Sequence, residues 1–432
     1  MMRIRASFPL LILLFALAAP LALAQSTNLS TTKEQSLSQK EGVAAQAALA
    51  NAQSVTGALT MVQTAERIAS AKRLLKAHTT VASSDFVTLA ALDPATSQIH
   101  LLPVSKELFS TRGAETSLTT SLGHGARLKI VRANGVNTAV TVTDEATGRS
   151  LVPLAVEYPV RSGKLAYYTS AHPAILSQEV VADGKTYVRR MLEEVARRLR
   201  VEGINIAPEI VDVAEHLCIV EHADHGRFRA ENRSALFEEI LSLYALNAGD
   251  TYRYSVSVAG AGGMVQMIPS TYEMVRRLHP EVELNPDFVE GMSDHANALS
   301  AMLLYMQDTW DTLARSQDVQ DALRSGIATQ PELLAAGYNS NPARLPLYLR
   351  RGGPGWRTLI PTETQMYLQI YGSLDSLITF NRSRPEPQAP DALAPPALAA
   401  LNRILQPRGK SKAAPVAGDW FIGASLALAD LK

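Results

Sequence analysis

The chain has a single cysteine, Cys218, among its 432 residues, so no disulfide can form within it and its stability must come from packed cores. It also lacks an excess of either charge, since 41 Lys and Arg balance 41 Asp and Glu. A net charge of zero gives no electrostatic basis for binding a polyanion, which argues against a nucleic-acid partner. Long hydrophobic runs are scarce as well: after the first 24 residues, no apolar stretch approaches the roughly 20 residues that span a bilayer.

Residues 1–24 have the pattern of a secretory signal peptide. Arg3 and Arg5 precede an apolar run over 8–19, and an Ala-Leu-Ala cleavage site ends at Ala24. The alternative is an uncleaved membrane anchor, for which this apolar run is short. We therefore expect an exported protein of the periplasm or cell envelope.

Composition divides the remaining chain into four parts. Residues 25–80 are rich in Ala, Gln, Ser and Lys and predict helices that could contact other cell-envelope proteins. Residues 84–182 contain short β-rich runs and predict a small β domain, with Asp183-Gly184 as a turn after it. Residues 185–380 have helical periodicity, and the Pro/Ala-rich stretch 381–432 predicts a tail. The expected fold class is α+β, with several domains.

The glycine-rich stretch from Ser257 to Thr271, Ser-Val-Ala-Gly-Ala-Gly-Gly-Met-Val-Gln-Met-Ile-Pro-Ser-Thr, is the most informative part of the chain. Glycines at 260, 262 and 263 allow positive φ or a close approach of the backbone to a ligand. Gln266 offers donors and acceptors suited to sugar hydroxyl or acetamido groups. A glycine-rich loop alone would predict only a turn.

Glu221 is the candidate general acid. A helix that begins at Pro208 would carry an apolar stripe through Ala214, Leu217 and Cys218 to this carboxylate. Desolvation at the rim of an apolar face raises the pKa of a carboxyl group, as an acid working near neutral pH requires. The spacing alone is equally consistent with a carboxylate that points to water at a helix end.

Together these stretches resemble the lytic transglycosylase (SLT) domain of the goose-type-lysozyme-like superfamily. Residues 257–271 match its signature, Ser-x-x-Gly-Ala-x-Gly-x-x-Gln-x-x-Pro-x-Thr, at every fixed position. Two further blocks follow in the family's order, Ala335-Ala-Gly-Tyr-Asn-Ser-Asn-Pro342 and Pro361-Thr-Glu-Thr-Gln-Met-Tyr367. The resemblance covers about 205–372 and implies that 185–380 is mainly α and lysozyme-like.

The resemblance also implies roles for the residues around the glycine-rich stretch. Glu221 would act first as an acid and then as a base. Ser257 would hydrogen-bond near its carboxylate, and Gln266 would hold a sugar beside the Gly263 backbone. No metal, nucleotide or other cofactor would be required.

Three residues of the later blocks complete the implied site. Tyr338 would orient the carboxylate through its hydroxyl, Asn339 would line the substrate wall, and Glu363 would be a structural or subsite residue. The implied reaction cleaves the β-1,4 bond between N-acetylmuramic acid and N-acetylglucosamine in peptidoglycan and closes a 1,6-anhydro ring. The alternatives are a lysozyme-like hydrolase of the same bond, and a non-catalytic protein that binds or scaffolds peptidoglycan.

The chain departs from the family pattern after Glu221. His222 stands where the family usually has Ser or Thr, and Ser257 follows Glu221 by 36 positions, a much longer spacing than usual. The intervening sequence predicts an inserted helix. Glu238 and Glu239 lie nearer the glycine-rich stretch and are rival candidates for the acid. Glu221 is preferred because a long apolar helix precedes only this carboxylate.

A metal site is the remaining interpretation of this region. His216, Glu221, His222, Asp224 and His225 lie close together in the sequence. Recognised zinc spacings are absent, however, and polar residues that leave a helix end explain the cluster more simply. We therefore expect no metal.

Overall fold

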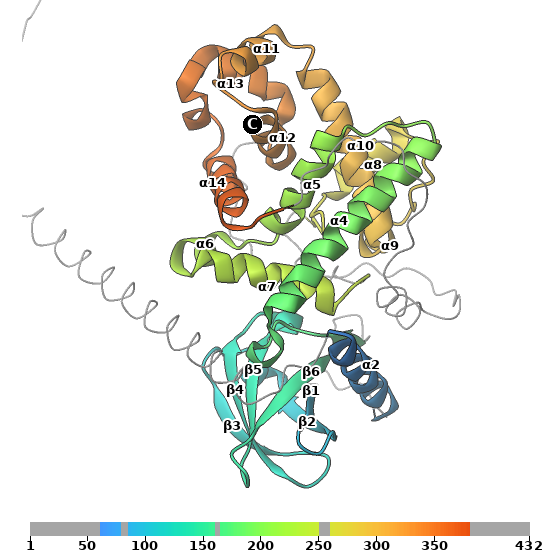
Figure 1. The fold of residues 1–432 in the computed structure, drawn as a ribbon, viewed down its shortest axis with the longest axis vertical. Helices are drawn as coiled ribbons and strands as arrows, with labels where there is room; N and C mark the ends of the chain where they lie inside the picture. The colour runs from blue at the N-terminus through green and yellow to red at the C-terminus, as the bar shows by residue number, and fades with distance from the viewer. Residues whose placement is uncertain (1–60, 79–84, 160–164, 250–259, 381–432) are drawn as a thin grey trace, which may run out of the picture.

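The computed structural model describes residues 61–78, 85–159, 165–249 and 260–380, which form a β-sheet domain and a helical region (Figure 1). The fold class is therefore α+β. The predicted signal peptide, the first part of the 25–80 segment, Ser257 and the 381–432 tail lie outside the described residues. Within the described ranges, none of the helices has the length and apolar character needed to cross a bilayer.

The sheet has the strand order β2-β1-β6-β5-β4-β3, with β7 paired to β6, and every pairing is antiparallel. Its strands are β1 (Phe86–Leu92), β2 (Ile99–Ser105), β3 (Glu115–Thr119), β4 (Gly125–Arg132), β5 (Ala139–Asp144), β6 (Ser150–Pro159) and β7 (Leu165–Tyr168). The Ser121 N–H donates to the Leu101 carbonyl at 2.9 Å, which brings β2 to the turn between β3 and β4. All of these strands lie inside 84–182, where short β-rich runs predict a β domain.

Helix α2 (Met61–His78) covers part of this sheet (Figure 1). Its buried residues Ile68, Ala71 and Leu75 belong to one hydrophobic cluster with residues of β1 and β6. Spacings of three and four residues place these side chains on one helix face, which is the face that an amphipathic helix buries. The described part of the predicted N-terminal helical segment thus packs on the β domain.

The helical region begins immediately after the sheet. Its α-helices are α4 (Gln178–Val201), α5 (Pro208–Val220), α6 (His225–Ala230), α7 (Arg233–Leu246), α8 (Pro269–Leu278), α9 (Phe288–Ser293), α10 (His295–Leu313), α11 (Gln317–Arg324), α12 (Gln330–Asn339), α13 (Leu345–Gly352) and α14 (Thr362–Leu377). This region also contains the short helices η2 (Pro173–Ile175), η4 (Pro342–Arg344) and η5 (Gly353–Thr358), while α3 (Lys106–Phe109) and η1 (Gly135–Asn137) lie between strands of the sheet. The predicted start of α5 at Pro208 is confirmed, with this proline in the first turn.

The turn predicted at Asp183-Gly184 is wrong, because both residues lie inside α4. This helix begins at Gln178, where the Ser177 side chain accepts a hydrogen bond from the Val180 N–H. A Cβ at Gly184 would lie 1.9 Å from the Leu241 carbonyl oxygen. The glycine therefore permits α4 and α7 to cross closely, and its role is in packing.

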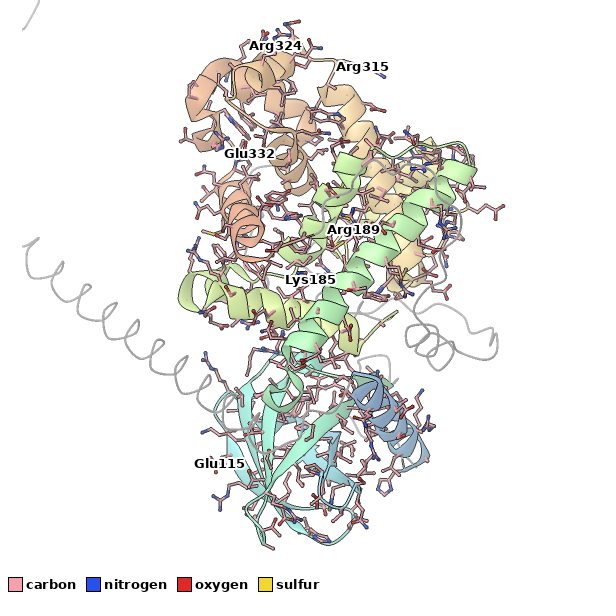
Figure 2. The ribbon with its side chains drawn as sticks, in the orientation of Figure 1. Glu115, Lys185, Arg189, Arg315, Arg324 and Glu332 are labelled. Carbon is pink, nitrogen blue, oxygen red and sulfur yellow. The ribbon has the colours of Figure 1, made fainter. Side chains whose placement is uncertain are left out.

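Helix α4 also fixes α5, which leads to Glu221. Arg189 of α4, labelled in Figure 2, donates to Asp212 at 2.8 Å and to the buried Glu215 at 3.0 Å, both on α5. Burial raises the pKa of Glu215 to about 7, although Arg189 opposes this rise. One hydrophobic cluster continues from the sheet through α4 and α5 into α10 and α14, so the helix that leads to the site rests on a continuous core.

Candidate active site

Glu221 lies immediately after α5, as its C-terminal cap, and is half-buried. The preceding turn consists of fully buried apolar residues, among them Leu217 and Cys218. Burial raises the pKa of the Glu221 carboxyl to about 8, and the nearby charge of Glu363 acts in the same direction. A hydrogen bond from Tyr367 opposes the rise. At neutral pH this carboxyl is mainly protonated, which suits it to proton donation.

The tyrosine that serves Glu221 is Tyr367 of α14. Its hydroxyl donates to the Glu221 Oε1 at 2.6 Å, and its side chain is buried. The expected donor, Tyr338, instead donates to the Val265 carbonyl at 2.6 Å. Tyr338 still lies close enough for the Glu221 charge to raise its pKa, after the larger effect of burial. The prediction for Tyr338 is therefore corrected: it supports the glycine-rich loop, while Tyr367 orients the carboxyl group.

Residues 260–268 form a tight turn before α8. Gly262 and Met267 pair across it, and both Gly260 and Gly263 adopt positive φ, at 77° and 74°. A Cβ at Gly263 would lie 2.4 Å from the Met292 carbonyl oxygen, so this position requires glycine for its φ and for its close packing. Gln266 also has a positive φ of 46°, which is uncommon for a residue other than glycine.

The carbonyl groups of this turn bind it to the rest of the site. The Met264 carbonyl lies 3.1 Å from the His222 Nε2 and 3.4 Å from the Tyr244 hydroxyl, while the Val265 carbonyl accepts from Tyr338. Burial lowers the pKa of His222 to about 3, so the ring is neutral and its Nε2–H can donate to this carbonyl. His222 thus connects the end of α5 to the loop.

The remaining predicted site residues differ in their exposure and partners. The Gln266 Nε2 donates to the Gly263 carbonyl at 2.9 Å, so part of its amide is used within the loop. The Asn339 Oδ1 is buried and has no hydrogen-bond partner among the residues that the structure describes. Glu363, in the first turn of α14, is exposed. The structure therefore brings Glu221, Tyr338 and the glycine-rich loop together, with Glu363 close enough to influence Glu221.

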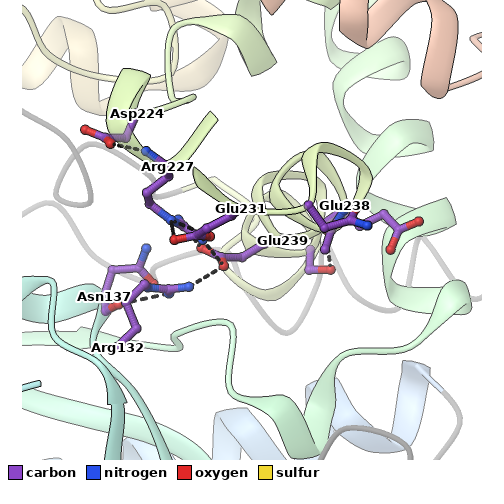
Figure 3. A network of polar contacts seen from close by, with 10 residues as sticks. Arg132, Asn137, Asp224, Arg227, Glu231, Glu238 and Glu239 are labelled. Atoms are coloured by element: carbon purple, nitrogen blue, oxygen red, sulfur yellow. Dashed lines mark hydrogen bonds and ion pairs between the residues drawn. The ribbon is translucent and has the colours of Figure 1, made fainter. Parts of the chain in front are cut away.

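Of the two rival carboxylates, Glu239 lacks the properties of a general acid. Glu239 is buried between Arg132 and Arg227, and Figure 3 shows Glu238 pointing away from both arginines. Burial alone would raise the pKa of Glu239, but the two arginines outweigh it and hold that pKa below its usual value. Glu239 is therefore ionised in an ion-pair network, and we retain Glu221 as the candidate acid.

The histidines and acids around Glu221 have separate structural partners. The His216 Nε2 lies 3.2 Å from Asp375, and the Asp224 side chain caps α6 by accepting from the Arg227 N–H. Over residues 61–78, 85–159, 165–249 and 260–380, no group of three or more His, Cys, Asp or Glu side chains could hold a metal ion.

Sequence reasoning missed two tyrosines of this site. Tyr367 is the last residue of the block 361–367 that resembles the family, and this position could have marked it as a site residue. Tyr244 lies in α7, and no local pattern separates it from an ordinary core tyrosine.

Comparison of the chain with protein-family models, curated proteins and solved structures gives no match.

Proposed function

We propose that the chain is an exported lytic transglycosylase, which cleaves the β-1,4 bond between N-acetylmuramic acid and N-acetylglucosamine in peptidoglycan. We further propose that its helical region is lysozyme-like. The observation that carries the proposal is Glu221, a half-buried carboxyl with a pKa near 8, bonded to Tyr367 beside the glycine-rich loop. A carboxyl group of this kind holds its proton at neutral pH until a leaving oxygen takes it.

The reaction would use this one carboxyl group twice. Glu221 would donate its proton to the glycosidic oxygen while the acetamido group of the muramyl sugar assists at the anomeric carbon. The resulting carboxylate, stabilised by the Tyr367 hydroxyl, would accept the proton of the muramyl 6-hydroxyl as the 1,6-anhydro ring closes. Gln266 and Asn339 would contact the sugars through the exposed parts of their amide groups.

Glu363 supports a hydrolase as the second candidate. Ordinary glycosidases use two carboxyl groups, of which one can activate water or attack the sugar. Glu363 is exposed, and its charge contributes to the raised pKa of Glu221, so a second carboxylate lies near the acid. If Glu363 activates water, the product has a reducing end in place of the anhydro ring.

Digestion of purified peptidoglycan tests both candidates. The protein is incubated with intact sacculi, and the soluble products are identified by mass spectrometry. Anhydromuropeptides, lighter than the reducing-end products by the mass of one water, would support the transglycosylase. Reducing-end products would support the hydrolase, and glycan binding without any product would favour a binding or scaffold protein.

The two site tyrosines are expected to differ in their effect on the pH profile. Activity requires protonated Glu221, so it should fall as pH rises through about 8. Because the Tyr367 hydroxyl stabilises the carboxylate, Tyr367→Phe should move this alkaline limb upward by roughly one pH unit. Tyr338→Phe is the matched control and should leave the limb in place, since that hydroxyl bonds Val265. The reverse pattern in kcat/KM against pH would show that Tyr338 orients the acid.

A further inference from the structure

The insertion between Glu221 and the glycine-rich loop contains α6 and α7, and it contributes Tyr244 to the site. This side chain is fully buried. Its hydroxyl donates to the Cys218 carbonyl at 2.6 Å and lies 3.4 Å from the Met264 carbonyl. Cys218 lies one turn before Glu221, and Met264 is within the glycine-rich turn. A single hydroxyl group therefore contacts both parts of the candidate active site.

The Cys218 carbonyl needs a partner because α5 ends here. A continuing helix would use the His222 N–H to bond this carbonyl, but that N–H donates to the Ile219 carbonyl at 3.1 Å. The Tyr244 hydroxyl donates to the Cys218 carbonyl in place of the His222 N–H. The His222 ring also packs edge-on against the Tyr244 ring, with centroids 6.1 Å apart. Residues on both sides of Glu221 thus contact one tyrosine of the insertion.

Helix α7 is itself fixed to the β-sheet domain, beside which it lies in Figure 1. Glu239 pairs with Arg132 at the end of β4, as Figure 3 shows. At the C-terminal end of α7, the Asn247 Oδ1 accepts from the Thr169 N–H at 3.0 Å, and its Nδ2 donates to the Thr169 carbonyl at 2.7 Å. Tyr244 therefore projects from the part of α7 between these two attachments, at the middle and at the C-terminal end of the helix.

We propose that Tyr244 is a positioning residue, supplied by the insertion, that holds the end of α5 against the glycine-rich loop and so fixes the orientation of Glu221. The catalytic consequence rests on the proposed function, whereas the effect on the end of α5 does not. Other groups that face Glu221 are Tyr367 and Glu363 from α14 and Tyr338 from α12. Tyr367 donates a hydrogen bond to the Glu221 carboxyl group, whereas Tyr244 holds the backbone at the end of α5, from which the Glu221 side chain projects.

Tyr244→Phe tests the proposal, because it removes only the hydroxyl and retains the buried ring. We expect kcat to fall about tenfold with KM unchanged, since small misplacements of a reacting group are costly. The single thiol of the chain, Cys218, is fully buried and reports on the same turn. Its reaction with an aromatic disulfide reagent under native conditions should become about tenfold faster as the helix end opens more often.

Tyr272→Phe is the matched control. Tyr272 is also buried, and its hydroxyl donates to the Asn285 carbonyl at 2.8 Å, so this variant also loses a buried hydrogen bond. The kcat and the thiol reaction rate of Tyr272→Phe should stay within about twofold of the parent values. The lost hydrogen bond does not involve the end of α5, so local opening around Cys218 should not change.

The cleavage rate and the thiol reaction rate together distinguish failure of the proposed function from failure of the proposed role of Tyr244. If the parent cleaves peptidoglycan and both tyrosine variants behave alike, Tyr244 has no positioning role. If the parent cleaves nothing, the proposed function fails, but a faster thiol reaction in Tyr244→Phe alone still supports the role of this tyrosine at the helix end. An unchanged thiol rate would overturn that role. Failure of Tyr244→Phe to fold, judged by circular dichroism, would also overturn it by indicating a global function of the hydroxyl.

Discussion

Glu221→Gln is expected to lower the rate of glycan cleavage by roughly 10²–10⁴-fold while binding to peptidoglycan remains. Glutamine has almost the same shape and can still accept from the Tyr367 hydroxyl, but it has no acidic proton for the leaving oxygen. The carboxylate needed for the second proton transfer is absent as well. The rate of product release from sacculi, measured together with binding of the variant to the same sacculi, checks both parts of the expectation.

Loss of activity in this variant is not expected to come from unfolding. The folded-state pKa of Glu221 is about 8, well above its ordinary value of 4.5, so the unfolded chain releases this proton at lower pH than the folded protein. The carboxyl group therefore lowers the free energy of unfolding progressively as pH rises from about 4.5 toward 8. Glu221→Gln removes this effect and should be at least as stable as the parent at pH 7.

Urea denaturation at pH 5 and at pH 8 measures that difference. The variant should gain stability relative to the parent between the two values, in the direction that the raised pKa requires. Full activity in Glu221→Gln would instead show that another group donates the proton. A variant less stable than the parent at pH 8 would show that the carboxyl is ionised and favourably paired in the folded protein.

Local features of the chain were predictable because each depends on a few adjacent residues. Pro208 starts α5 because its fixed φ suits the first turn, and the positive φ of Gly260 and Gly263 follows from their missing side chains. The apolar stripe of α5 was equally consistent with a desolvated carboxyl after it and with one that points to water. The raised pKa of Glu221, caused mainly by burial, agrees with the first of these alternatives.

Features that depend on distant partners were not predictable. Tyr338 lies near the end of α12 and Tyr367 in the second turn of α14, and only the packing of these helices around α5 decides which hydroxyl reaches Glu221. Asp183 and Gly184 form a pair typical of turns, yet Gly184 lies where α4 crosses α7 and leaves room for the backbone of Leu241, a residue distant in the sequence. The partners of Glu239 come from β4 and α6, so its ion pairs could not be read from its neighbours.

Glu239→Gln is expected to lower the free energy of unfolding by about 3–5 kcal/mol, since it removes a buried carboxylate, leaves the half-buried Arg132 without its ion-pair partner and leaves Arg227 paired with Glu231 alone. The Arg227 Nη1 and Nη2 donate to the Glu239 Oε1 and Oε2 at 3.0 and 2.8 Å, and Arg132 bonds the Glu239 Oε2. Burial opposes the charge of Arg132 and lowers its pKa despite this pairing, so loss of the partner should be especially unfavourable there.

The neighbouring Glu238→Gln provides a control on the same helix. The Glu238 side chain points away from the ion-pair network, so its replacement should change the free energy of unfolding by less than about 0.5 kcal/mol.

The lowered pKa of Glu239 means that its carboxylate stabilises the fold above the ordinary pKa near 4.5, and that this stabilisation is lost as pH falls through the folded-state value. The difference between Glu239→Gln and the parent should therefore be largest at neutral pH and should shrink in acid. Urea denaturation of the three proteins across this range measures it. Equal stability of both glutamine variants at pH 7 would mean that the carboxylate of Glu239, although paired with two arginines, contributes no more to stability than that of Glu238.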